Sequence, residues 1–288
     1  GSTNMTVTPL ERAIRDACFL ESTARKAGNV HPEASFEHLS YADFVRSADA
    51  VASVLARSRE VGVGQTILNA VRSTKAVCSH NTNLGIILLL APLAAVEPQA
   101  SLKDGIVSVL SSLTVEDSRL VYEAIRLAAP RGLGDSEAED VSDEPSQSLV
   151  EVMRLAADRD LIARQFATNF ELVLDFGLRL LNAKSFQADW ESQVLHLQLE
   201  LMAATPETDI LRKRGQAEAE EASRRARAIL QAGWPNSSEA RSLFAAFDAW
   251  LREYGSERNP GTVADLVTAC LFAALREGRI TMPDSLAR

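Results

Sequence analysis

Four short polar segments interrupt a sequence that is otherwise rich in apolar residues, and they carry most of the side chains that could do chemistry. They are 26–31 (Lys-Ala-Gly-Asn-Val-His), 80–85 (His-Asn-Thr-Asn-Leu-Gly), 207–215 (Glu-Thr-Asp-Ile-Leu-Arg-Lys-Arg-Gly) and 259–265 (Asn-Pro-Gly-Thr-Val-Ala-Asp). Cations and free backbone N–H groups bind phosphates, whereas carboxylates bind metal ions or move protons. The residue types therefore predict a pocket for a small anionic molecule.

The segment 80–85 stands directly before an apolar run, residues 86–96. If Asn81 or Thr82 caps a helix there, the N–H groups of its first turn face out of the core and form an anion site. A helix cap without a ligand is the simpler interpretation. Both alternatives stay open.

Charged side chains gather in the segment 207–215, where two carboxylates precede three cations within about two helical turns. By default these charges form a solvated helix face, and Asn-Pro-Gly at 259–261 forms a turn before the last helix. The four histidines show no HExxH spacing and no pairing with cysteine, so we expect no transition-metal site. The acidic segment 132–145 is expected to be either a surface loop or a lid over the site.

Helices must position these segments, because no alternation of β-branched residues predicts a strand and only 6% of the residues are aromatic. Apolar residues recur at helical spacing in the ranges 10–24, 41–57, 65–77, 149–181, 189–204, 216–232, 238–254 and 262–277, and another helix is expected to end near residue 129. The run 86–96 is apolar on every side and belongs at the centre of a bundle. We predict an all-α protein of about ten helices, a single domain over residues 5–288 around that central helix.

Composition and charge exclude several classes of protein. Among the 288 residues, 30 Lys and Arg oppose 39 Asp and Glu, a net charge of −9, so we expect no nucleic-acid partner and no anionic membrane partner. The apolar run 86–96 contains Pro92 and is shorter than the ~20 residues that a membrane-spanning helix needs. Three scattered cysteines fit a reducing compartment, and we expect a cytoplasmic protein. Residues 1–4, before Met5, have the form of an expression-vector remnant.

Taken in order, the polar segments resemble the motifs of the triphosphoribosyl-dephospho-CoA synthase family, which makes the precursor of the prosthetic group of citrate lyase and malonate decarboxylase. The family patterns Lys-Pro-Gly-x-Val, Asp-Phe-x-x-Ser-Ala, Asn-Thr-x-x-Gly, Asp-Thr…Arg and Pro-Gly-x-x-Ala-Asp-Leu are similar to residues 26–30, 43–48, 81–85, 207–215 and 260–266. Each motif alone is weak. The ordered set extends over residues 21–275 and is specific.

The resemblance implies a transferase that joins the ribose triphosphate of ATP to dephospho-CoA and releases adenine, with Mg²⁺ accompanying ATP. The 2′-hydroxyl of dephospho-CoA would attack the anomeric carbon, so the site needs cations for the triphosphate and a carboxylate for an oxocarbenium-like transition state. The catalytic candidates are Asp209, Glu207 and Asp265, and Asp209 and Asp265 are also candidate Mg²⁺ ligands. The candidate nucleotide- and phosphate-binding residues are Lys26, Gly28, Asn29, Asn81, Thr82, Asn83, Gly85, Thr208, Arg212, Lys213, Gly215, Asn259 and Gly261. Which carboxylate is the base and which binds metal stays open.

The chain departs from the usual family motifs in three segments. Asn83 and Leu84 replace the His and Lys of Asn-Thr-His-Lys-Gly, Ala27 replaces the proline of Lys-Pro-Gly, and Arg-Lys-Arg-Gly at 212–215 replaces the usual Arg-Gly-Gly. These changes favour a divergent branch and keep two alternatives open. One is a related phosphoribosyl- or nucleotide-dependent transferase in the biosynthesis of a methanopterin- or methanofuran-type coenzyme, and the other is a non-catalytic nucleotide-binding helical protein. A homodimer is a further expectation.

Overall fold

The computed structural model describes residues 6–128 and 144–286, and all regular elements of these residues are helical. The fourteen α-helices are α1 (Pro9–Thr23), α2 (Tyr41–Leu55), α3 (Ser58–Val61), α4 (Val63–Val77), α5 (Leu84–Ala94), α6 (Leu102–Ser111), α7 (Val115–Ala128), α8 (Leu149–Ala156), α9 (Leu161–Ala167), α10 (Ala183–Ala204), α11 (Thr208–Arg214), α12 (Gln216–Gln231), α13 (Ser238–Leu251) and α14 (Gly261–Arg276). A π-helix, η1 (Leu172–Gly177), and a 3₁₀ turn, η2 (Asp284–Leu286), complete the set. The all-α class is confirmed, although the helix count is higher than ten. Residues 1–4 and nearly all of the acidic segment 132–145 lie outside the described residues.

The prediction of one helix over 149–181 is wrong, because three elements occupy that range. Asp160 begins α9 by accepting the backbone N–H groups of Ile162 (2.8 Å) and Ala163 (3.0 Å) with Oδ1. Asn169 and Phe170 then adopt φ angles of 54° and 61°, in the left-handed region that an α-helix does not use, so α9 ends and η1 follows. Apolar spacing alone does not register such breaks.

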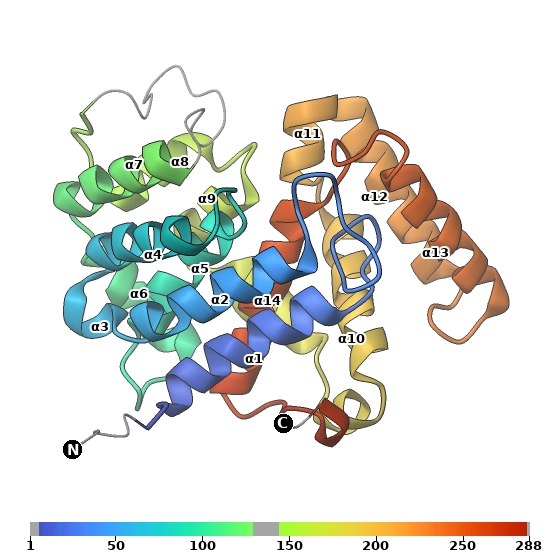
Figure 1. Ribbon diagram of the computed structural model, residues 1–288, viewed down its shortest axis with the longest axis horizontal. Coiled ribbons are helices and arrows are strands. Elements are labelled where there is room, and N and C mark those ends of the chain that lie inside the picture. Colours follow the sequence, from blue (N-terminus) through green and yellow to red (C-terminus); the bar gives the residue numbers. More distant parts are fainter. Residues whose placement is uncertain (1–5, 129–143, 287–288) are drawn as a thin grey trace.

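Helices α5 and α14 form the centre of the fold (Figure 1). Every residue of α5 except Gly85 is buried, as expected for an element that is apolar on all sides. α14 is buried from Thr262 to Ala274 with Asp265 as the one half-buried exception. α1, α9, α10, α11 and η1 pack on α14, while α2, α4, α6 and α9 pack on α5. The carboxylate of Asp265 is therefore the one side chain between Thr262 and Ala274 of α14 that is not fully buried.

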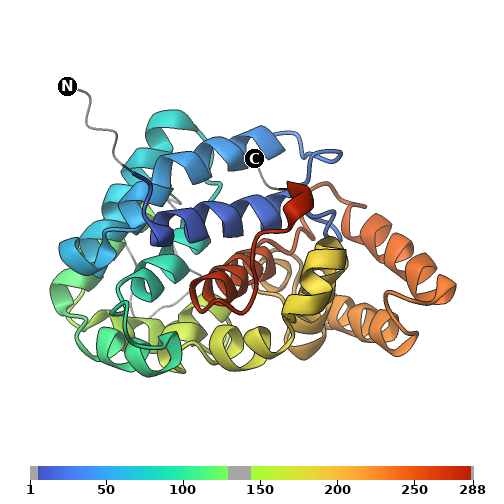
Figure 2. The same cartoon turned by 90° about the horizontal axis from the view of Figure 1, so that it is seen from below.

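Helices α12 and α13 project from this core as an antiparallel pair, visible at the right of Figure 1 and again from below in Figure 2. α12 packs on α10 and α11, and α13 packs on α12. Beyond the end of α13, the guanidinium of Arg258 lies 4.0 Å from the Trp250 ring centroid and 4.6 Å from that of Tyr254. In the described part of the chain, none of the helices combines the length and apolar character needed to cross a bilayer.

Candidate active site

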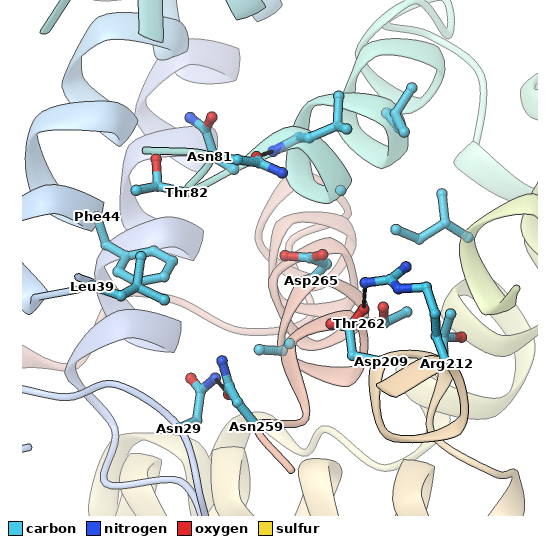
Figure 3. Close-up of a pocket in the computed structure, with 18 of the residues that line it drawn as sticks. Asn29, Leu39, Phe44, Asn81, Thr82, Asp209, Arg212, Asn259, Thr262 and Asp265 are labelled. Carbon is cyan, nitrogen blue, oxygen red and sulfur yellow. Dashed lines mark hydrogen bonds and ion pairs between the residues drawn. The ribbon is translucent and has the colours of Figure 1, made fainter. Parts of the chain in front are cut away.

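A cavity of about 610 Å³ opens where the N-terminal ends of α5, α9, α11 and α14 meet (Figure 3). Loop residues before α2 and α5 and the loop after α1 complete its wall. Twelve of the predicted site residues line it: Asn29, Asn81, Thr82, Asn83, Gly85, Thr208, Asp209, Arg212, Lys213, Asn259, Gly261 and Asp265. The fold thus brings together residues from all four polar segments.

Asp265 lies near the middle of this cavity, one turn into α14 (Figure 3). Its Oδ2 is so close to Gly85 that a Cβ at that position would lie 1.9 Å away, so only glycine fits at the start of α5. Among the described residues, the structure gives the Asp265 carboxylate no hydrogen-bond or ion-pair partner. Burial, reinforced first by Asp209 and then by Glu21, raises the pKa of Asp265 well above its ordinary value.

Asp209 lines the same cavity from α11, close to the start of α14 (Figure 3). Its Oδ1 accepts Nη2 of Arg212 at 2.7 Å, and its Oδ2 lies against Gly261, where a Cβ would be 2.7 Å away. The two glycines at the starts of α5 and α14 therefore serve one purpose, which is to let a carboxylate approach a helix N-terminus.

Two further carboxylates line the cavity and were missed by the sequence analysis. Asp160 is buried before α9, and burial raises its pKa in spite of the two backbone N–H groups that its carboxylate accepts. Glu21 is 3% exposed on α1 and belongs to the wall as well. Glu21 continues the apolar stripe of Ala17 and Cys18 by one turn, and a carboxylate on a buried helix face was the signal that could have found it.

Lys26 and Gly28 do not line the cavity, although both were expected to bind phosphate. The Lys26 side chain is fully buried and pairs with Oε1 of Glu21 at 3.2 Å, and its ammonium also donates to the backbone carbonyls of Glu21 and Ala24. Gly28 has a φ of +66° and packs against Leu251, so its role is to shape the loop.

Glu207 and Gly215 also lie off the wall. Glu207 is 1% exposed and joins two helix starts, because Oε2 accepts the N–H of Ile210 (2.9 Å) and Oε1 that of Val263 (3.0 Å). Burial and the nearby Asp209 raise the pKa of Glu207 to about 8, against the lowering effect of these N–H groups. Gly215, with φ of +93°, forms the turn between α11 and α12. The positions of Glu207 and Gly215 therefore indicate a structural role for both residues.

The segment before α5 uses its side chains internally. Asn81 Oδ1 accepts the N–H of Leu84 at 3.3 Å, the Thr82 hydroxyl pairs with Ser47, and the Asn83 amide joins Thr74 (3.0 Å) and the Ser47 carbonyl (3.4 Å). An anion at this helix start would therefore meet mainly backbone N–H groups.

A sequence model of the ATP:dephospho-CoA triphosphoribosyl transferase (CitG) family matches residues 8–283. The chain belongs to this family. A crystal structure from Archaeoglobus fulgidus, described as that of a candidate triphosphoribosyl-dephospho-CoA synthase, is similar with a TM-score of 0.62 and 26% sequence identity, over 81% of this chain and 98% of that chain. No curated protein matches the chain significantly.

Family membership makes the chain a transferase of the triphosphoribosyl-dephospho-CoA synthase type, which joins the ribose triphosphate of ATP to dephospho-CoA. This confirms the first expectation, and neither the methanopterin-type alternative nor the non-catalytic one is favoured. Asn83 and Leu84, which replace the His and Lys of the family's Asn-Thr-His-Lys-Gly motif, have different surroundings. The Asn83 amide is bonded to α2 and α4, whereas Leu84 is 7% exposed and contributes an apolar patch to the wall.

Proposed function

We propose that ATP lies in the central cavity with its triphosphate toward Arg212 and Lys213 and its ribose beside Asp265. The observation that carries this proposal is Asp265 itself, a carboxylate without a protein partner among the described residues at the centre of the wall. Arg212 and Lys213 are exposed cations on that wall, and Lys213 has no ion pair within the described residues. Within the described part of the chain the N–H of Gly85, on the wall at the start of α5, has no hydrogen-bond partner and supplies a further donor to phosphate.

In the transfer step, the 2′-oxygen of dephospho-CoA forms a bond to C1′ of the ATP ribose while the bond from C1′ to the adenine nitrogen breaks. Adenine leaves with the electron pair, and the proton lost by the hydroxyl balances the proton that adenine gains. A carboxyl group whose pKa is raised can hold a proton near neutral pH, and its anion stabilises positive charge at C1′. Asp265 is thus placed to carry this proton, with Asp209 as the second carboxylate at the ribose.

Magnesium fits this arrangement as a companion of the triphosphate. The described residues hold no group of three or more His, Cys, Asp or Glu side chains that could bind a metal by themselves. Mg²⁺ commonly takes one or two carboxylates and obtains its other ligands from phosphates and water. With Asp265 assigned to the proton, Oδ2 of Asp209 is the carboxylate oxygen that would coordinate Mg²⁺, since Oδ1 of Asp209 is already bonded to Arg212. Mg²⁺ would neutralise the triphosphate while the chain positions it.

The test is adenine release from ATP, Mg²⁺ and dephospho-CoA, measured for the wild type and for Asp265→Asn. We expect turnover to fall by at least about a hundredfold, the scale of lost acid–base catalysis, with the melting temperature close to that of the wild type. Asp158→Asn is the matched control, because Asp158 is 84% exposed and lies off the wall. Wild-type turnover in Asp265→Asn would overturn the assignment. If that variant unfolds, the role of Asp265 is structural.

The proposal places the enzyme in the cytoplasm, where ATP and dephospho-CoA would be its partners, and includes a homodimer as its assembly. The sequence features that support the location are the three scattered cysteines. Light scattering of the purified chain tests the assembly directly, since a monomer at working concentration would contradict it.

A further inference from the structure

Two asparagines from opposite ends of the sequence form a side-chain pair at one end of the cavity. Asn29 Nδ2 donates to Asn259 Oδ1 at 2.7 Å, and both residues line the wall. The pairing uses one donor and one acceptor. Among the described residues the Asn29 side-chain oxygen and the Asn259 amide nitrogen have no other partner, so they can still bind a ligand. Figure 3 shows both remaining groups directed toward the cavity. Arg212 lies on the other side of the cavity.

Helix α13 holds the Asn29 side of this pair from behind. Arg252 Nη2 donates to the backbone carbonyl of Asn29 at 2.7 Å, and Asp248 Oδ1 accepts both Arg252 Nε (2.9 Å) and the backbone N–H of Gly28 (2.7 Å). The Asn259 side is held by its neighbour Arg258, which bonds to Glu218 and to the Trp250 carbonyl. These contacts anchor the backbone at 28–29 and the residue next to Asn259, so both asparagines are supported from behind.

The chemistry of the pair suits a neutral, planar group with an acceptor beside a donor. A phosphate offers only acceptors and would face the free Asn29 oxygen unfavourably. The ring of Phe44 and the side chain of Leu39 line the cavity across from Asp265 (Figure 3) and provide an apolar face for an aromatic base. Asparagine amides read the adenine edge through its ring nitrogen and its N6 amino group.

We infer that the Asn29–Asn259 pair is the base-reading element of the site and recognises the hydrogen-bonding edge of an adenine stacked against Phe44. This rests on the proposed function, because both substrates, ATP and dephospho-CoA, carry an adenine. The shared chemistry is the adenine edge, and the experiment distinguishes its two sources.

The decisive variant is Asn259→Asp. It keeps the oxygen that accepts from Asn29 but replaces the free donor with an acceptor. The hydrogen bond between the two residues therefore persists, while the hydrogen-bonding pattern that the pair presents to a ligand changes. ITP is the probe for the ATP site, and the hypoxanthine analogue of dephospho-CoA is the probe for the other. ATP and ITP give the same transfer product, so product formation is measured by chromatography for each pair of substrates, and affinity is measured by calorimetry.

For the wild type we expect a preference for adenine over hypoxanthine of about tenfold or more at one of the two substrates, the scale of one bidentate asparagine contact. In Asn259→Asp this preference should fall toward one, chiefly through KM. A shift confined to ATP assigns its adenine to the pair, and a shift confined to dephospho-CoA assigns the other adenine. Phe44→Ala should weaken binding of the same substrate more than Phe44→Leu, because it removes the wall entirely.

An unchanged preference for both substrates in a folded Asn259→Asp variant would overturn the inference. So would a fall in kcat alone. The calorimetric measurement distinguishes failure of this inference from failure of the proposed function. If the wild type binds ATP without turnover, the base preference in binding still decides the role of the pair, and if ATP does not bind at all, both ideas fail. Should Asn259→Asp not fold, Asn29→Ser with the same probes takes its place.

Discussion

Two pairs of a carboxylate and a cation stand at the cavity, and they differ in burial far more than in composition. The inner pair is Glu21 on the wall with Lys26 behind it, and the mouth pair is Asp209 and Arg212, both on the wall. The side chains of Lys26 and Glu21 are 0% and 4% exposed, with 3.2 Å between Nζ and Oε1. Arg212 and Asp209 are 42% and 19% exposed, with 2.7 Å between Nη2 and Oδ1. In the sequence, Lys26, Asp209 and Arg212 belong to the polar motifs, and Glu21 lies in the helix before the first motif. The sequence alone gives no reason to treat the two pairs differently.

The difference teaches which charges remain available to a ligand. Burial lowers the pKa of Lys26 and Glu21 opposes that shift, so each charge is held by the other. The Lys26 ammonium has three acceptors within the fold and nothing left to offer a phosphate. The Arg212 guanidinium is at the mouth in high dielectric, where exchanging a carboxylate for a triphosphate costs little.

The largest effect should come from Lys26→Met. Removing the cation leaves Glu21 as an uncompensated buried carboxylate, so we expect the free energy of unfolding to fall by about 3–5 kcal/mol. Urea denaturation measures it. The paired variant Lys26→Met with Glu21→Gln should recover much of this loss, because the buried charge is gone. A single variant as stable as the wild type would refute the structural assignment of Lys26.

A smaller but clear loss of stability should follow from Glu207→Ala. The variant leaves the N–H groups of Ile210 and Val263 without their carboxylate acceptor, so we expect about 2–3 kcal/mol of destabilisation. Glu207→Gln retains one carbonyl acceptor and should lose less. If both variants unfold like the wild type but lose adenine release, Glu207 acts on the substrate and its structural assignment is wrong.

The sequence predicted the helical class, the central apolar helix and most of the wall, because each depends on local patterns. An apolar run such as 86–96 is stable only at the centre of a helical bundle, and the residues of a motif stay close together because they are adjacent in the chain. The sequence could not distinguish the role of Asp265 from that of Glu207. Both are carboxylates at helix starts, and only the packing of α11 against α14 decides that one faces the cavity and the other the backbone.

Burial also explains the remaining differences. Whether Lys26 reaches a ligand depends on how α1 meets α14, a contact between segments nearly the whole chain apart. Asp160 was hidden inside a range that has helical spacing from end to end, and its capping role appears only once that range divides. Gly28 resembles a phosphate-binding glycine in its motif but is needed for its fit against Leu251.

The smallest effect on stability, and the sharpest contrast with Lys26, is expected for Arg212→Gln. An exposed pair three residues apart on a helix stabilises by less than about 1 kcal/mol, so urea denaturation should barely change. The KM for ATP should rise several-fold, since a triphosphate loses one cation. Arg119→Gln is the matched control: Arg119 pairs with Glu116 at the same spacing, is 54% exposed and lies off the cavity wall. Equal KM values for these two variants would mean that the mouth pair, like the inner one, serves the fold alone, and the triphosphate would then depend on Lys213 and the start of α5.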